Sequence, residues 1–139
     1  MKGKEKGLWK KCWGFTRLFI GPHRLVCPPW ELVYISPNRL LMQGAYDQVI
    51  EAYGQMGLAV NSPQIMADHI GAELNFAALL EENIRLGDEN FPEAARKFRR
   101  NHLERWIPQF NTHLENGADC CFYRALALDT RNFLERGYT

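Results

Sequence analysis

The chain has 139 residues, of which 46% are hydrophobic and 24% charged, and its formal net charge is +1. This length suffices for one domain and is too short for two ordinary ones, and the near-zero net charge gives no overall electrostatic indication of a partner. No signal peptide precedes the chain, and its four cysteines lack C-x-x-C spacing, so we expect a cytosolic protein with free thiols.

The first half of the chain predicts two helices joined by a proline-rich loop. Residues 1–7 form a basic, flexible lead-in. Leu8–Ile20 is apolar over most of a helical circumference, and its apolar run is too short to cross a bilayer. His23–Asn38 is predicted to be an ordered loop. Arg39–Met56 has the period of an amphipathic helix.

The second half of the chain predicts three further helical segments. Ser62 precedes Pro63–Asn83, which is the arrangement of a capped helix start. Phe91–Ile107 is a fourth helix that Pro108 should kink or restart, and Asp119–Arg136 is the last. No window alternates like a strand, so we expect one all-α helical domain over residues 8–136.

Two polar residues lie on the apolar face predicted for Pro63–Asn83, namely His69 and Glu73. Buried polar groups cost free energy unless each finds a partner. At a spacing of i, i+4 the two side chains could pair with each other inside the core. The alternative is that this face stays open and binds another molecule. Pattern alone favours the internal pair.

Other polar patterns indicate no enzyme, zinc site or nucleic-acid surface. His102 shares a face with Phe98 and Trp106, which predicts a core histidine with a satisfied side chain. Neither a nucleophile beside a base, nor zinc-ligand spacing, nor a phosphate-binding glycine loop occurs. The basic residues after Phe91 are predicted to be a solvated surface, with contact to an acidic partner as the second interpretation: Arg96, Lys97, Arg99, Arg100 and Arg105.

Several spaced motifs, taken together and in this order, resemble the TorD/DmsD family. These are cytosolic maturation chaperones for molybdenum-containing redox enzymes that the twin-arginine (Tat) pathway exports. The resemblance runs from about Phe15 to Leu134 and rests on Phe15-Thr16-Arg17-Leu18-Phe19-Ile20-Gly21-Pro22, Pro28-Pro29-Trp30-Glu31, Val33-Tyr34, Asp68-His69, His102-Leu103 with Trp106 and Phe110, and Phe122-Tyr123-Arg124-Ala125-Leu126-Ala127.

The resemblance implies a chaperone of anaerobic respiration that binds a twin-arginine leader peptide and its immature molybdoenzyme. Such a leader joins two guanidinium groups to an apolar stretch, so its receptor needs an apolar groove ending in carboxylates. The resemblance also raises guanine-nucleotide binding, for which the sequence shows no motif; no cofactor is otherwise expected. The expected peptide-binding residues are Trp30, Tyr34, Phe76 and Leu80 as the apolar wall, Glu31, Asp68 and Glu73 as arginine partners, and His69 as the residue that orients a carboxylate.

The chain departs from the family pattern in two ways. Ile65 and Met66 stand where members carry Glu-Pro, which weakens the acidic edge of the expected site. Members also have several more helices before the Arg-Leu-Phe segment, so an N-terminally shortened form is expected. Leu8–Ile20 should then leave apolar surface uncovered, which predicts self-association, with helices exchanged between chains. The alternative function is a degenerate fragment that binds no leader.

Overall fold

The computed structural model describes residues 15–20, 25–35, 42–60 and 66–136. Within these ranges every regular element is helical, which confirms the all-α class, and an isolated bridge between Trp30 and His69 is the one strand-like contact. No helix of the described ranges is long and apolar enough to cross a membrane. The predicted lead-in and most of the predicted first helix lie outside these ranges.

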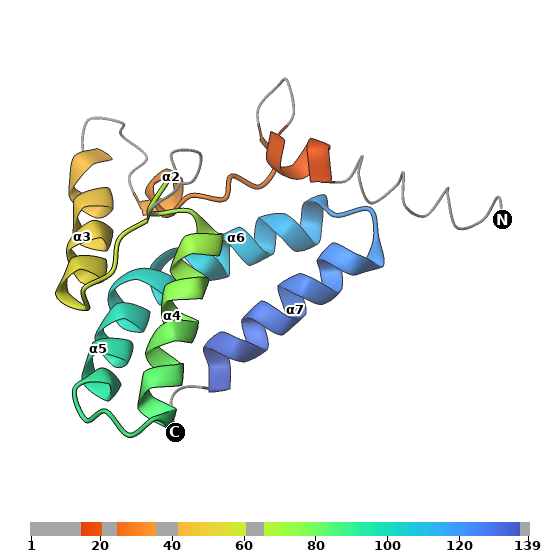
Figure 1. Ribbon diagram of the computed structural model, residues 1–139. Helices are drawn as coiled ribbons and strands as arrows, with labels where there is room; N and C mark the ends of the chain where they lie inside the picture. Colours follow the sequence, from red (N-terminus) through yellow and green to blue (C-terminus); the bar gives the residue numbers. More distant parts are fainter. Residues whose placement is uncertain (1–14, 21–24, 36–41, 61–65, 137–139) are drawn as a thin grey trace, which may run out of the picture. The chain divides into compact units, whose positions relative to one another are not determined.

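Contacts divide the chain into two compact units. One consists of residues 1–29 with 108–137, and the other is the continuous stretch 30–107. Figure 1 labels the α-helices. In chain order the elements are η1 Thr16–Ile20, α2 Glu31–Ile35, α3 Met42–Gln55, α4 Ile70–Arg85, α5 Phe91–Phe98, η3 Arg99–Leu103, α6 Glu104–Gly117 and α7 Cys121–Arg136.

The unit of terminal segments packs around the aromatic ring of Phe19. This ring stacks on Phe110 at a centroid distance of 6.5 Å and meets the edge of Tyr123 at 5.7 Å. The backbone N–H of Cys27 donates to Leu18, and its thiol donates to the carbonyl of Phe110. These contacts join η1 and the segment after it to α6 and α7.

The unit of residues 30–107 is built on α4. In this unit α4 packs against α5, while α2 packs against α3 (Figure 1). The buried rings of Tyr53, Phe76 and Phe98 meet at its centre, with Phe76 at 4.6 Å from Tyr53 and 4.7 Å from Phe98. Aromatic pairs at such distances contribute about 0.5–1.5 kcal/mol beyond their buried area.

Glycine residues follow two of the helices, since Gly57 and Gly87 come after α3 and α4 with φ of 71° and 87°. That left-handed conformation suits glycine and ends a helix. The proline-rich segment His23–Asn38 was predicted to be a loop. This was wrong for Glu31–Ile35, which form the helix α2.

The predicted helix through Pro108 also needs correction. Its backbone widens into the π-helical turn η3, and α6 then runs through Pro108 without restarting. Position 108 lies in the second turn of α6, where the missing N–H leaves just one carbonyl of the first turn without its helical partner.

The close approach of Gly117 to Val26 gives a test of the packing in the terminal unit. A Cβ at position 117 would overlap Val26 Cγ1. Gly117→Ala should therefore lower the free energy of unfolding by about 1–3 kcal/mol, the usual cost of overpacking. Urea unfolding measures this change. The matched control is Gly54→Ala in α3, where a Cβ meets nothing within 4 Å and should raise stability by about 0.5–1 kcal/mol; equal losses at both positions would contradict the packing described.

Candidate functional site

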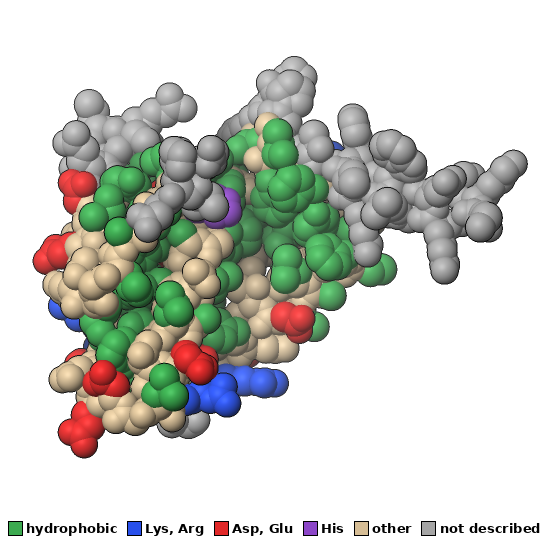
Figure 2. Space-filling view, viewed as in Figure 1, with side chains coloured by type: hydrophobic (Ala, Val, Ile, Leu, Met, Phe, Trp, Pro, Cys, Tyr) green, Lys and Arg blue, Asp and Glu red, His purple; other side chains and the backbone are tan. Residues whose placement is uncertain are grey.

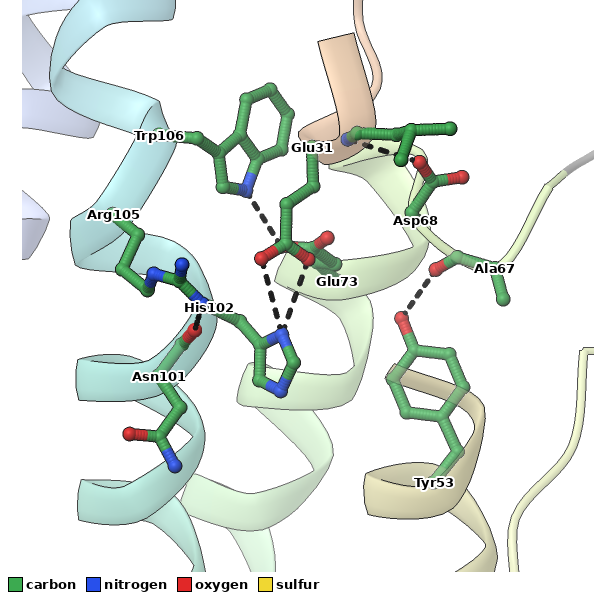
Figure 3. Close-up of polar contacts among 10 residues, drawn as sticks. Glu31, Tyr53, Ala67, Asp68, Glu73, Asn101, His102, Arg105 and Trp106 are labelled. Carbon is green, nitrogen blue, oxygen red and sulfur yellow. Dashed lines mark hydrogen bonds and ion pairs between the residues drawn. The ribbon is translucent and has the colours of Figure 1, made fainter. Parts of the chain in front are cut away.

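A cluster of buried carboxyl groups occupies the centre of the unit of residues 30–107 (Figure 3). Both oxygens of Glu31 lie within hydrogen-bond distance of His102 Nδ1, at 3.1 and 3.2 Å. Glu73 accepts a hydrogen bond of 3.0 Å from the indole N–H of Trp106. Neither glutamate has any solvent exposure. Because a carboxylate can only accept, His102 Nδ1 must carry the proton in its bond to Glu31.

Two short segments far apart in the chain fix the position of this cluster. Trp30 and His69 form an antiparallel bridge, and the backbone N–H of Glu31 donates to the carbonyl of Asp68 at 3.0 Å. The Asp68 carboxylate accepts from the N–H of Leu32 at 3.2 Å. Asp68 thus satisfies two N–H groups in the first turn of α2, which have no partner within the helix.

Glu73 is held in its protonated form. Burial raises the pKa of Glu73 far above its usual range, and the neighbouring Glu31 carboxylate raises it further. The hydrogen bond from Trp106 opposes this shift and is the weaker effect. Two adjacent carboxyl groups cannot both ionise in a dry interior. With Glu73 protonated, the pair of glutamates carries one negative charge opposite His102, and Glu73 Oε1 has no hydrogen-bond partner from another described residue.

One carboxylate oxygen of Asp68 has no hydrogen-bond partner from another described residue. The residue is 1% exposed, and its Oδ1 accepts no hydrogen bond from another described residue. Burial raises the pKa of Asp68, while the N–H of Leu32 lowers it. An unpaired buried carboxylate oxygen is costly and would be stabilised by a donor that reached it.

His69 is the N-cap of α4. Its Nδ1 accepts a hydrogen bond of 3.0 Å from the backbone N–H of Gly71, so the proton of the neutral ring lies on Nε2. The ring meets Trp30 edge-on at 6.1 Å and is half-buried. Burial lowers the pKa of His69, against a smaller opposing effect of Asp68. A neutral imidazole also suits the positive end of the helix dipole.

A groove of about 610 Å³ opens beside His69 and α4. Figure 2 shows hydrophobic side chains gathered on the face that α3 and α4 present. Such a volume lies within the range of ligand sites, and the side chains at its mouth are exposed and mostly apolar. The groove is lined by Tyr53, Leu58, Ala59, Val60, His69, Gly71, Ala72, Asn75, Phe76 and Leu79.

The structure brings most of the predicted site residues together, though in different roles. Phe76 and His69 line the groove. Tyr34 packs against Trp106 at a centroid distance of 5.4 Å, and Leu80 is buried in the core. Trp30 contacts His69 at the start of α4.

The predicted start of the helix around His69 was wrong. Met66–His69 precede α4, which begins at Ile70, because Asp68 and His69 bond to the Trp30–Leu32 segment. The expected pair of His69 and Glu73 side chains is replaced by separate partners, Gly71 and Trp106. The capping prediction at Ser62 lies outside the described residues.

Sequence reasoning missed the residues that complete the cluster. His102 was correctly expected to be a satisfied core histidine, and its ring stacks on Phe98 at 4.8 Å. Its partner Glu31 is 71 positions away, which no periodicity reveals. The hydroxyl of Tyr53, which donates to the carbonyl of Ala67 at 2.7 Å, was also missed.

Comparison with known proteins identifies the family. A family model described as nitrate reductase delta subunit matches residues 6–112, more than half of the chain. A Haemophilus influenzae protein named "Probable Tat proofreading chaperone DmsD" is 34% identical over 134 residues, which span 95% of this chain and 63% of that protein. A Salmonella typhi protein named "Tat proofreading chaperone DmsD" is 34% identical over 116 residues, which span 81% of this chain and 52% of that protein. No solved structure matched the chain.

The chain belongs to the TorD/DmsD family, with which the nitrate reductase delta subunit model corresponds. It spans between half and two thirds of the length of these curated relatives. Both relatives are named as chaperones, and the family is one of chaperones, in agreement with the expectation that the chain is not an enzyme.

Replacing Glu73 tests its protonated state. The pKa of Glu73 is raised on folding, so the unfolded chain ionises first, and stability is lost as pH rises above about 4.5. Glu73→Gln keeps the acceptor for Trp106 and a donor toward Glu31 but cannot ionise. At pH 8 it should raise the free energy of unfolding by roughly 1–3 kcal/mol, with little change at pH 4.5. Urea unfolding at both pH values measures this.

The control for that experiment is Glu73→Leu, which leaves the buried Trp106 N–H without its acceptor. At pH 8 the free energy of unfolding of Glu73→Leu should therefore be about 1–3 kcal/mol lower than that of Glu73→Gln. If Glu73→Gln were less stable than the original chain at both pH values, Glu73 would have to be ionised in the folded state.

Replacing His69 tests the capping bond. The folded-state pKa of His69 is lowered, so its stabilising contribution is complete above about pH 6.5 and is lost as pH falls below that value. His69→Ser preserves an N-cap acceptor without a titrating group. The variant should lose less stability than the original chain between pH 7 and pH 5, as thermal unfolding would show. An unchanged slope for His69→Ser would contradict this assignment.

Proposed function

We propose that the chain is a cytoplasmic chaperone that binds the twin-arginine leader of a molybdenum-cofactor oxidoreductase and assists its maturation before export. Membership of the TorD/DmsD family supports a chaperone role, and both curated relatives are named as Tat proofreading chaperones. The observation that carries the proposal is the groove beside α4, with His69 in its wall and the unpaired Asp68 Oδ1 adjacent in the chain.

The apolar part of the leader would lie in the groove. A leader segment that becomes helical presents an apolar face every third or fourth residue, and Leu58, Val60 and Leu79 are between 36% and 41% exposed along the groove. Covering these side chains would remove apolar surface from water, which stabilises a complex at about 25 cal/mol per Å² before ordering costs.

The arginines would meet Asp68 at the His69 end of the groove. Asp68 is buried, so a guanidinium can reach Oδ1 only if neighbouring residues move aside. Each charge-assisted hydrogen bond contributes about 1.5–3 kcal/mol, whereas micromolar affinity corresponds to about 8 kcal/mol. The groove must therefore contribute much of the binding. Glu31 is occupied by His102, and Glu73 has no solvent exposure and a pKa that burial raises far above its usual range, so we assign the arginine contact to Asp68 alone.

Titration with leader peptides tests this proposal. A peptide with the intact Arg-Arg pair and apolar stretch should bind at micromolar concentration, and its Lys-Lys counterpart should bind about tenfold more weakly, because lysine cannot donate in the bidentate manner. Asp68→Asn keeps an acceptor for Leu32 but removes the charge, and should also cost about tenfold. Isothermal titration calorimetry measures all three affinities.

The matched control is Asp47→Asn on the exposed side of α3, which should bind the Arg-Arg peptide as the original chain does. Equal affinity for both peptides would remove the arginine contact from the proposal. No binding at high micromolar peptide would favour the alternative, a family fragment without leader binding.

Self-association stays a prediction. In the unit of terminal segments the apolar side chains of Phe15, Ile20, Phe122 and Leu126 are 44–61% exposed. Exposed apolar side chains of this size favour contact with another surface, and helices exchanged between copies would provide one.

A further inference from the structure

A second hollow lies between α3 and the continuous run of α5, η3 and the first turn of α6. It shares one lining residue, Phe76, with the groove. This cleft has a volume of about 290 Å³, near the lower end of the range for small-molecule sites, and belongs entirely to the unit of residues 30–107. Its lining is formed by Gln48, Glu51, Ala52, Gln55, Met56, Phe76, Ala94, Lys97, Phe98, Asn101, His102 and Arg105.

The inner part of the cleft offers an aromatic floor and one imidazole nitrogen. Phe76 and Phe98 meet edge to face, and His102 stacks on Phe98. His102 is 5% exposed, and its Nδ1 is committed to Glu31 (Figure 3). Its Nε2 has no hydrogen-bond partner among the described residues. With the proton on Nδ1, a neutral ring presents Nε2 as an acceptor, so a guest here must bring a donor.

The rim of the cleft carries more positive than negative charge. Lys97 and Arg105 are exposed, and neither has a carboxylate partner in the described ranges. The neighbouring Arg96 and Arg99 differ, because they pair with Glu93 and Glu104 at 2.9 and 2.8 Å. Glu51 is the carboxylate of the lining, and it accepts from Gln55 at 3.3 Å.

We propose that this cleft binds a small organic carboxylate with a flat apolar body and a hydrogen-bond donor at its far end. The carboxylate would lie between Lys97 and Arg105 at the rim, which provide charge-assisted donors. The body would lie on Phe76 and Phe98, and the donor would reach His102 Nε2. Each part of this ligand thus contacts a different feature of the cleft. The site is distinct from the groove assigned to the leader.

Three matched probes test the three features. The probe 3-(4-hydroxyphenyl)propionate has the carboxylate, the ring and the hydroxyl donor. Its analogue 3-phenylpropionate lacks the donor and should bind about fivefold more weakly, the loss of one hydrogen bond of about 1 kcal/mol. Tyramine keeps the hydroxyl but carries an ammonium group, and should show no binding at millimolar concentration. Calorimetry gives the affinities, and the ring resonances of His102 should shift with the first probe.

Substitutions at the rim of the cleft provide the second part of the test. Arg105→Gln and Lys97→Gln should each weaken the first probe about three- to tenfold, whereas Arg96→Gln, which removes a nearby cation outside the lining, should change it less than twofold. Equal binding of the three probes, equal effects of Arg96 and Arg105, or no binding of the first probe at millimolar concentration would each overturn the proposal. Adding a leader peptide to the same samples separates the sites, since the proposed guest should bind the cleft whether or not a leader binds the groove.

Discussion

The hydrogen-bonded group of Glu31, His102, Glu73 and Trp106 is the interaction on which the unit of residues 30–107 depends. An isolated carboxylate in a dry interior costs several kcal/mol, and this cluster contains two within an aromatic core. Three devices offset that cost: the imidazole N–H facing Glu31, the indole N–H facing Glu73, and a proton retained on Glu73. Because the four side chains come from α2, α4, η3 and α6, their polar requirements fix how these elements pack.

Asp68 both stabilises the start of α2 and retains a carboxylate oxygen without a partner from another described residue. Its Oδ2 and its backbone carbonyl hold the first turn of α2, while Oδ1 is left without a partner from another described residue. Both oxygens of Glu31 lie within hydrogen-bond distance of His102, whereas Glu73 accepts from Trp106 through Oε2 and its Oε1 has no hydrogen-bond partner from another described residue. Buried carboxylates of similar appearance in the sequence therefore differ in what they can offer to another molecule.

Much of the secondary structure follows from the sequence, while the site geometry follows only in part. The amphipathic period finds α3, α4 and α7, and the conformational freedom of Gly57 explains one helix end. The same period fails before α4, because tertiary bonds from the Trp30–Leu32 segment hold Asp68 and His69 outside the helix. The Glu31–His102 contact spans 71 positions, and a helical period says nothing about such a pair. The family motifs do mark Asp68-His69, whose neighbourhood includes the groove.

The chain passes from one compact unit to the other at two places, after Pro29 and after Ile107. The carboxyl cluster, the groove and the cleft are therefore encoded by one uninterrupted stretch of the polypeptide. Changes confined to the described residues of the other unit would therefore remove none of the residues that form these features.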